Sequence, residues 1–479
     1  MSEYYHRRRS SVVQIGDTPL GGDNPIRIQS MATTPTDNTE ACVAQAIRII
    51  AAGGEYVRFT TQGIREAENL KNISAALRAQ GVTTPLVADV HFNPHVADVA
   101  ALYAEKVRIN PGNYIDTART FRHLSYTDEE YAAEIQKIHD RLVPFLDICR
   151  QHHTAIRLGV NHGSLSDRIM SRYGDTPEGM VESCLEFLRV CVDEHFSDVV
   201  ISIKASNTVV MVKTVRLLVE RMDKEGMSFP IHLGVTEAGE GEDGRIRSAV
   251  GIGALLGEGI GDTIRVSLSE EPEAEIPVAR KLIAYSKESA NRRAMAVAQD
   301  NKNNCSHEDH IQDGILTLHY NETSLEDLQL KAAMDAGALL IDGKAHDLVL
   351  VNTNASIPPE QIQKTQDAIL QAARIRFTKT EYISCPGCGR TLYNLQQTIA
   401  RIKAATSHFT GLKIAIMGCI VNGPGEMADA DYGYVGAARG KVSLYRQKEC
   451  VEKNIPESKA VEKLLALIEK DKTNAILKK

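Results

Sequence analysis

Short apolar runs that end in polar or charged residues recur along the first 285 residues, and a stretch with helical spacing follows each of them. Two of these stretches, residues 39–54 and 65–81, are amphipathic and end in glycine, a frequent helix terminator. The eight runs are PIRIQSM from Pro25, EYVRFT from Glu55, PLVADVHF from Pro85, KVRINPGN from Lys106, AIRLGVNHG from Ala155, DVVISIKASN from Asp198, PIHLGVTEAG from Pro230 and DTIRVSLS from Asp262.

Eight alternations of strand and helix predict an α/β fold, a (β/α)8 TIM barrel, over residues 1–285. A doubly wound open sheet is the alternative that the same alternation allows. In a barrel, functional side chains lie at the carboxyl ends of the strands. The polar ends of the eight runs are therefore the place to look for chemistry.

Two further units are predicted after the barrel. Residues 286–376 contain a polar stretch, QDNKNNCSHEDH. The apolar runs GILTLHY and DLVLVN and stretches with helical spacing follow, and together they predict a small α/β insertion. Its first helix is expected to start with a capping box of Thr323 and Glu326. Residues 377–479 alternate short strands and helices and predict a compact C-terminal α+β domain.

Five basic side chains stand at the ends of five different predicted strands. Such a convergence of positive charge is stable only with an anion, and arginine forks match phosphate oxygens. The pattern predicts a phosphorylated or diphosphorylated substrate. The five residues are Arg58, Arg108, Arg157, Lys204 and Arg265.

Other strand ends carry groups suited to catalysis, namely Asp89, His91, Asn161 and Glu237. A buried glutamic acid can carry a proton to a substrate. Lys204 allows a different interpretation, because a desolvated lysine at a barrel strand end can form a Schiff base, as in aldolases. That alternative is a carbon–carbon lyase or transferase on a phosphorylated substrate, with a structural zinc bound by the cysteines.

The sequence CPGCGRTL places Cys385 and Cys388 at C-x2-C spacing, and IAIMGCIVNGPGEM adds Cys419 and Glu426. Thiolates at this spacing bind a soft metal. The pair alone favours zinc, but no second C-x2-C pair completes a zinc ribbon, and Cys450 has no informative spacing. Three thiolates with one carboxylate favour a catalytic iron–sulfur cluster, since a glutamate oxygen is a weaker ligand that a substrate oxygen can replace.

Composition narrows the functional classes. The chain of 479 residues has a formal net charge of −7, which argues against nucleic-acid binding, and no apolar run is long enough for a membrane helix. The N-terminal MSEYYHRRRS has no apolar segment behind it and does not predict a secretory signal. Nine scattered cysteines do not form a disulfide framework, so a reducing cytoplasm is expected.

In order along the chain, QSM, VADVHF, RINPGN, IRLGVNHGSL, SIKAS, HLGVTEAG, GEGIGDTIRVSL, CPGCGRTL and GCIVNGPGE resemble the 4-hydroxy-3-methylbut-2-enyl diphosphate synthase family of the methylerythritol phosphate pathway. The resemblance implies reductive ring opening of 2-C-methyl-D-erythritol 2,4-cyclodiphosphate, with loss of water. It also implies that two electrons pass through a 4Fe-4S cluster whose unique iron binds the substrate oxygen in place of Glu426.

The resemblance also assigns residues. It implies cluster ligation by Cys385, Cys388, Cys419 and Glu426, and diphosphate binding by Arg58, Arg108, Arg157, Lys204, Arg265 and Ser267. It places His91 and Asn161 in the substrate pocket and Asn422 beside the cluster. Glu237 is the expected proton donor or electrostatic partner, so the residues expected to act in catalysis are Glu237, Glu426 and Asn422.

Partners follow from the same resemblance. A flavodoxin or ferredoxin is the expected electron donor, and a homodimer is the expected assembly. In the short form of the family, the cluster domain of one chain covers the barrel of its partner. The segment 286–376 resembles a reduced form of the family's third domain, and a longer connection of this kind would let the chain close on itself. The sequence leaves that choice open.

Overall fold

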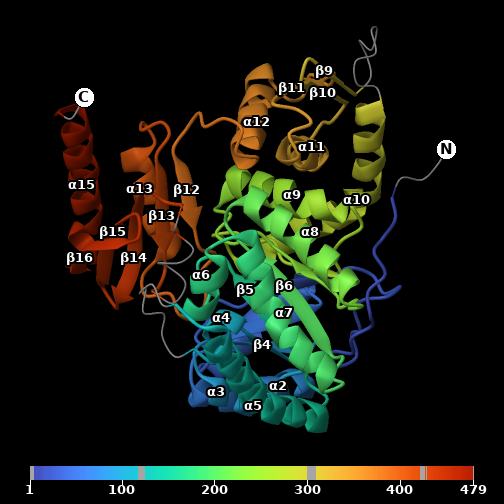
Figure 1. Cartoon of the computed structure of the whole chain (residues 1–479). Helices are drawn as coiled ribbons and strands as arrows, with labels where there is room; N and C mark the ends of the chain where they lie inside the picture. Colours follow the sequence, from blue (N-terminus) through green and yellow to red (C-terminus); the bar gives the residue numbers. More distant parts are fainter. Residues whose placement is uncertain (1–4, 117–124, 299–308, 421–426, 428, 478–479) are drawn as a thin grey trace.

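The computed structural model describes residues 5–116, 125–298, 309–420, 427 and 429–477, without the side chains of 473–477. It has three parts: a barrel, an insertion on one flank of the barrel, and a C-terminal domain on the side away from the N-terminus (Figure 1). None of the described helices is long and apolar enough to cross a membrane.

Eight parallel strands form the predicted barrel. They pair in the order β6-β5-β4-β3-β2-β1-β8-β7, and a parallel bridge between Ile201 and Ile231 joins β6 to β7 and closes the ring. Each strand coincides with one of the eight apolar runs, and only β2 extends one residue beyond its run, so the closed barrel is confirmed and the open sheet is wrong. The strands are β1 (Arg27–Met31), β2 (Tyr56–Thr61), β3 (Leu86–Val90), β4 (Lys106–Ile109), β5 (Ala155–Asn161), β6 (Val199–Lys204), β7 (His232–Leu233) and β8 (Thr263–Ile264).

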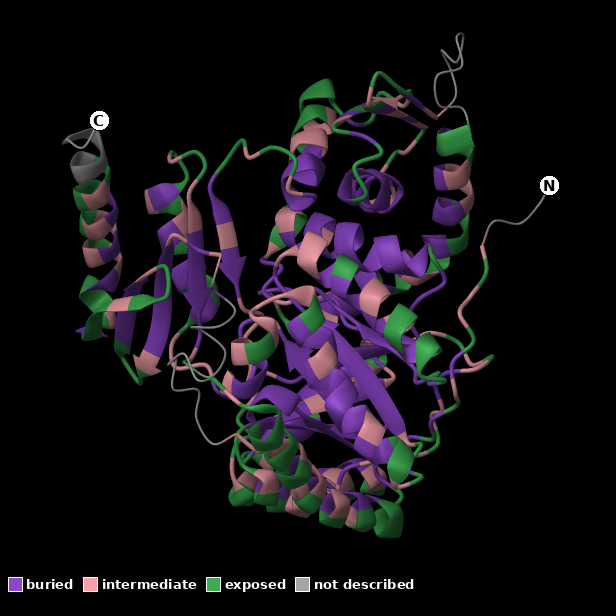
Figure 2. Ribbon diagram, in the orientation of Figure 1, coloured by how far each residue is buried: buried purple, intermediate pink, exposed green. Residues whose placement is uncertain are grey.

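Helices surround the strands and bury them (Figure 2). Several begin at an asparagine, serine or threonine whose side chain accepts a hydrogen bond from the first turn, as Asn207 does for α8. The barrel's helices are α1 (Thr39–Ala52), α2 (Ile64–Ala79), α3 (Pro94–Ala100), α4 (Pro111–Tyr114), α5 (Asp128–His152), α6 (Asp167–Tyr173), α7 (Pro177–Asp193), α8 (Thr208–Lys224), α9 (Gly241–Leu256), η1 (Pro272–Ala274) and α10 (Glu275–Ala298).

The amino-terminal end of the barrel is plugged. Val13 and Leu20 pair in a short hairpin, and both pack with Ile15 against Tyr56 and Val87 inside the barrel. Because this end is sealed by apolar side chains, the polar interior of the barrel opens only at the carboxyl ends of the strands.

The insertion folds as the predicted small α/β unit with a three-stranded sheet in the order β11-β10-β9. Its helix α11 packs closely on α9, where Gly337 and Gly253 leave room for Val250 and Met334. The expected capping box is wrong, because Ser324, one residue later than Thr323, caps α11 by accepting from the Asp327 amide. The elements are β9 (His310–Gln312), β10 (Ile315–Tyr320), α11 (Leu325–Ile341), β11 (Asp347–Asn352) and α12 (Pro359–Ala372).

The C-terminal domain has a five-stranded mixed sheet in the order β12-β13-β14-β15-β16, with parallel pairing among the first three strands. Cys450, whose spacing was uninformative in the sequence, lies on β16. The elements are β12 (Glu381–Ser384), α13 (Leu395–Thr406), β13 (Lys413–Met417), β14 (Tyr432–Ala438), β15 (Lys441–Arg446), β16 (Glu449–Pro456) and α15 (Glu457–Leu477).

The C-terminal domain rests on the barrel of its own chain. Ser384 forms a parallel bridge with Ala238, and its hydroxyl lies 2.9 Å from that of Ser269. Arg247 of α9 forms a buried ion pair with Glu381 of β12. The chain therefore closes on itself, which answers the question that the sequence left open.

Candidate active site

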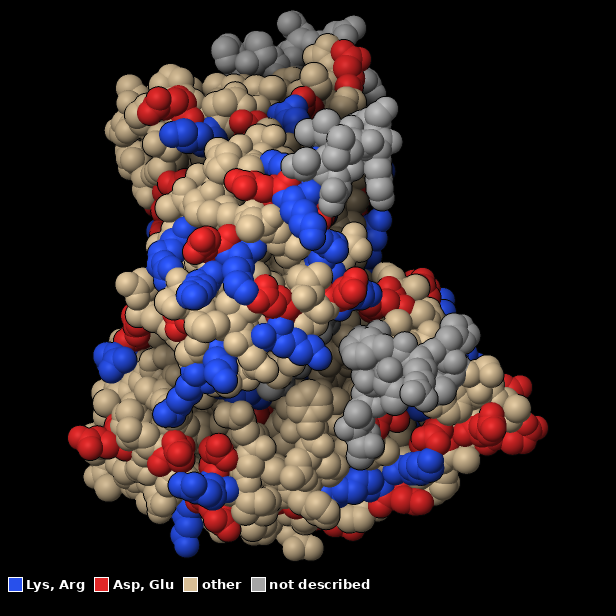
Figure 3. Space-filling model, turned by 90° about the vertical axis from the view of Figure 1, so that its left-hand side faces the viewer, with Lys and Arg blue, Asp and Glu red and all other residues tan. Residues whose placement is uncertain are grey.

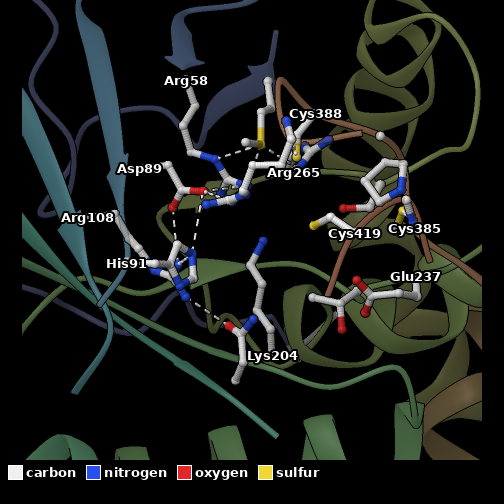
Figure 4. A pocket seen from close by; sticks show the side chains of 18 of the residues that line it. Arg58, Asp89, His91, Arg108, Lys204, Glu237, Arg265, Cys385, Cys388 and Cys419 are labelled. Atoms are coloured by element: carbon white, nitrogen blue, oxygen red, sulfur yellow. Dashed lines mark hydrogen bonds and ion pairs between the residues drawn. The ribbon is translucent and has the colours of Figure 1, made fainter. Parts of the chain in front are cut away.

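A cavity of about 90 Å³ lies between the carboxyl ends of the barrel strands and the cysteine loop, residues 385–391 (Figure 4). Both the barrel and the C-terminal domain contribute to its walls. All the site residues predicted from the sequence and described by the structure line it: Arg58, His91, Arg108, Arg157, Asn161, Lys204, Glu237, Arg265, Ser267, Cys385, Cys388 and Cys419. Asn422 and Glu426 lie outside the described residues.

The five predicted cations form a cationic pocket in the barrel, and all five are largely or wholly withdrawn from solvent. Burial, opposed by Asp89, lowers the pKa of Arg58 to about 10. Burial and neighbouring positive charge also lower the pKa values of Arg157 and Lys204 well below their ordinary range. Nε and Nη1 of Arg157 have no hydrogen-bond partner among the described residues. This excess of buried positive charge with unused donors suits an anion with several oxygens.

Asp89 is the carboxylate around which three of the basic groups gather. Its Oδ1 accepts from Arg108 at 3.1 Å, and its Oδ2 lies 4.0 Å from Arg58 and 3.7 Å from His91. Arg58 and Arg108, with a hydrogen bond from His91, hold the pKa of Asp89 well below its usual range despite burial, which acts in the opposite direction. The sequence indicated Asp89 as a group suited to catalysis, and the structure makes it the partner of Arg108.

A second carboxylate orients Arg265. Glu275, at the start of α10, accepts from Nη2 at 2.9 Å and from Nε at 3.1 Å, and it also accepts from Ser30. Such a two-point contact fixes the plane of the guanidinium. Glu275 has no signal in the sequence, because it lies ten positions after Arg265 in a helix that follows the barrel.

Two glycines, one in β5 and one directly after β7, make room for the basic side chains. A Cβ atom on Gly159 would lie 2.2 Å from Nε of Arg108, and a Cβ on Gly234 would lie 2.6 Å from Nζ of Lys204. Any larger residue would displace these cations. The glycines in RLGVN and HLGVT are thus part of the pocket, although they carry no functional group.

His91 and Asn161 both contact Arg108. The ring of His91 lies against Nη1 of Arg108, and the Asn161 side-chain oxygen accepts from Nη2 at 3.1 Å. Burial, with the positive charge of Arg108, lowers the pKa of His91 to about 3, so its ring is neutral at pH 7. A neutral His91 is a hydrogen-bonding group of the pocket and not an additional cation.

Glu237 lies across the cavity from the cationic pocket, on the side of Cys385 and Cys419 (Figure 4). Its backbone has the left-handed conformation, with φ of 50°, which a non-glycine residue adopts at a cost. The side chain is buried, and Oε2 has no hydrogen-bond partner among the described residues. A carboxyl group held in this way is available to a bound substrate.

The three cysteines face the cavity from the ends of β12 and β13. The backbone amide of Gly418 donates to Sγ of Cys385 at 3.2 Å, and the amide of Arg390 donates to Sγ of Cys388 at 3.4 Å. Amide donors to cysteine sulfur are a feature of iron–sulfur sites. The donor set therefore fits an iron–sulfur cluster.

A single metal ion fits less well. Among the described residues, no group of three His, Cys, Asp or Glu side chains is arranged to hold one ion. Tetrahedral zinc would bring its sulfur ligands within about 4 Å of one another. In a four-iron cluster each thiolate binds a different iron, so the sulfurs stand farther apart.

Arg390, two residues after Cys388, connects the cysteine loop to the barrel. Its Nη2 donates to Oδ2 of Asp89 at 3.1 Å, and both side chains are buried. The sequence gave Arg390 no function, because a contact between positions so far apart depends on how the two domains pack.

Comparison with known proteins identifies the family. The model of the GcpE TIM-barrel domain matches residues 10–280, and that of the GcpE protein C-terminal domain matches residues 381–470. The chain belongs to the GcpE family. The GcpE barrel match covers every strand of the cationic pocket, and the C-terminal match covers all three cysteines.

Curated GcpE relatives carry the name 4-hydroxy-3-methylbut-2-en-1-yl diphosphate synthase (flavodoxin). The protein of Bacteroides fragilis is 55% identical over 97% of this chain and 96% of its own, and that of Phocaeicola vulgatus is 56% identical over 97% and 98%. The Porphyromonas gingivalis protein is 46% identical over 98% of both chains. The first alignment spans 600 residues against 479 in this chain, so the relatives have segments without a counterpart here.

Proposed function

We propose that this protein is a 4-hydroxy-3-methylbut-2-enyl diphosphate synthase that reductively opens 2-C-methyl-D-erythritol 2,4-cyclodiphosphate. The observation that carries the proposal is a single cavity with a cationic pocket on one wall and three cysteines on the other. Binding of a diphosphate requires the basic side chains of the first wall. A two-electron reduction requires a redox cofactor, which the cysteines of the second wall can hold. The curated relatives are named for this product and for flavodoxin as electron donor.

The diphosphate is the group that the barrel binds. Arg58, Arg108, Arg157, Lys204 and Arg265, with the hydroxyl of Ser267, surround its oxygens and neutralise its charge. Glu275 holds Arg265 in orientation, and Asp89 holds Arg108. Because the cations are already positioned, binding fixes the carbon ring against the cysteine loop without large rearrangement of the pocket.

The cofactor is a 4Fe-4S cluster held by Cys385, Cys388 and Cys419, with Glu426 as the fourth ligand that the family resemblance implies. When bound, the cluster supplies electrons one at a time and acts as a Lewis acid toward the departing oxygen. Asn422 is proposed to lie beside it. The amides of Gly418 and Arg390 donate hydrogen bonds to two of the sulfurs and so stabilise their negative charge.

Glu237 is proposed to donate the proton that the reaction consumes. Ring opening takes up two electrons and one proton and releases one water and the linear diphosphate. The buried carboxyl of Glu237 faces the cavity from the side of the cysteines, where the departing oxygen would lie. His91 and Asn161 are proposed to contact the substrate beside Arg108.

The site does not require a second chain, since the described walls come from one barrel and its own C-terminal domain. The homodimer that the family resemblance implies is therefore not needed to complete the site. The insertion packs against α9 and joins the barrel to β12, so it acts as the connection that lets the chain close. We place the protein in the cytoplasm, with flavodoxin or ferredoxin as donor.

The decisive test is purification without oxygen, followed by metal analysis and turnover. The proposal predicts a brown protein with absorption near about 400 nm, about four irons per chain and conversion of the cyclodiphosphate by reduced flavodoxin. A colourless protein that holds one zinc and rejects iron and sulfide on reconstitution would refute it. Trapping of a substrate on Lys204 by borohydride would then support the Schiff-base alternative.

A further inference from the structure

The sheet of the C-terminal domain brings exposed basic residues to the same edge as the cysteines. Because β12, β13 and β14 run parallel, their carboxyl ends share one edge. Cys385 directly follows β12, and Cys419 lies two residues after β13. At the end of β14 the chain turns through Arg439 and Gly440 into β15, which begins at Lys441.

This turn lies close to the end of β13, where Cys419 follows. A Cβ on Gly436 would lie 2.3 Å from the carbonyl oxygen of Gly418, the residue before Cys419. Arg439 is three residues beyond Gly436, within about 10 Å of that contact by chain length alone. The amide of Glu457 donates to the carbonyl of Gly440, which brings the first turn of α15, with Lys459, beside the same turn.

Arg439, Lys441 and Lys459, here called the basic rim, are all exposed. The ion pairs found among the described residues include none of the three. Ile420, next to Cys419, has 55% of its surface exposed and gives the rim an apolar neighbour. Exposed cations around an apolar residue form a typical contact surface for an acidic protein.

The charge of the C-terminal domain contrasts with that of the whole chain. Residues 381–470 hold twelve Lys or Arg and nine Asp or Glu, although the chain as a whole has a net charge of −7. Lys and Arg side chains cross the middle of the face that the C-terminal domain presents (Figure 3). An acidic partner is therefore repelled by most of the molecule and attracted to this domain.

We propose that the basic rim is the docking site of the electron donor, a flavodoxin with an acidic surface around its flavin. This inference rests on the proposed function, because it requires a cluster at the cysteines. Because the cysteines also line the cavity, electrons that enter from the rim reach the substrate through the cluster that the cysteines hold. Each encounter transfers one electron, oxidising the flavin hydroquinone to the semiquinone, and two encounters supply one turnover. No bond forms or breaks between the proteins.

The test compares two reductants in the reconstituted holoenzyme. The variant R439E/K441E, and separately K459E, is assayed with reduced flavodoxin and with dithionite and methyl viologen, which need no protein docking. We expect KM for flavodoxin to rise about tenfold or more in R439E/K441E and its salt dependence to weaken. Turnover with dithionite should stay within about twofold of wild type, because the cavity is unchanged.

The control variant K344E/K364E makes the same charge change at two exposed lysines of the insertion, outside the C-terminal domain. Equal loss with both reductants, no loss with flavodoxin, or an equal loss in K344E/K364E would each overturn the docking proposal. A wild-type holoenzyme inactive with both reductants would refute the proposed function itself, and the docking proposal with it.

Discussion

Arg390 of the cysteine loop and Asp89 of β3 lie 301 positions apart and form a buried ion pair, with Nη2 3.1 Å from Oδ2. Asp89 also accepts from Arg108 of the cationic pocket. One carboxylate thus joins the residues that bind the diphosphate to the loop that holds the cysteines. The position of the C-terminal domain and the geometry of the pocket are therefore coupled through Asp89.

Removing either partner of this pair should weaken both substrate binding and domain docking. We expect R390M to lower kcat/KM by at least about tenfold, and D89N by more, because D89N also leaves Arg108 without its carboxylate. The double variant should lose less than the sum of the two single losses, expressed as free energies. Strictly additive losses in this double-mutant cycle would show that the two residues act independently.

Glu237→Gln should lower kcat about a hundredfold or more and leave KM for the cyclodiphosphate nearly unchanged, since the amide keeps the shape of the side chain but has no acidic proton to give. Glu242→Gln, at an exposed position in the first turn of α9, is the matched control and should retain activity. A Glu237→Gln enzyme with a normal kcat would exclude Glu237 as the proton donor.

Gly159→Ala should raise KM for the substrate about tenfold or more by displacing Arg108, whose Nε lies 2.2 Å from the position of the new Cβ. Gly63→Ala is a suitable control, because its Cβ would approach only the flexible end of Glu66. Steady-state kinetics of the two variants with the same reductant make the comparison. An unchanged KM in Gly159→Ala would mean that Arg108 has no close contact with the diphosphate.

Protonation of His91 in the unfolded chain should lower the free energy of unfolding of the protein in mild acid. Its folded pKa is about 3, below the unfolded value near 6.5, so the unfolded chain binds the extra proton. Stability associated with this residue is full above about pH 7 and falls as pH drops, by about 2 kcal/mol at pH 5. Asp89 is ionised in both states over this range and does not contribute.

Denaturant unfolding of the apo chain at pH 7.5 and pH 5 measures this effect. His91→Gln, which cannot take up a proton in either state, should lose less stability than wild type between these two pH values. Equal losses in the two proteins would show that His91 is not buried in its neutral form.

Much of the fold and of the site followed from local patterns. Each barrel strand could be predicted because an apolar run and its polar end are adjacent in sequence. Arg58, Arg108 and Arg157 were expected at the strand ends, but they lie within β2, β4 and β5. Arg390, Glu275 and Gly159 could not be assigned in this way. Their functions depend on contacts made after the chain folds, namely domain docking, the return of α10 to the barrel and the space around Arg108.

The central claim is that the cationic pocket and the cysteines of one chain form one site, and mixing two inactive variants tests it most directly. R157M lacks a pocket cation, and C385S lacks a cysteine. If each chain closes on itself, the mixture should show no more activity than the two variants measured separately. If the site forms between chains, mixed dimers with one intact site would restore about a quarter of wild-type activity. That recovery would contradict the closed single-chain site.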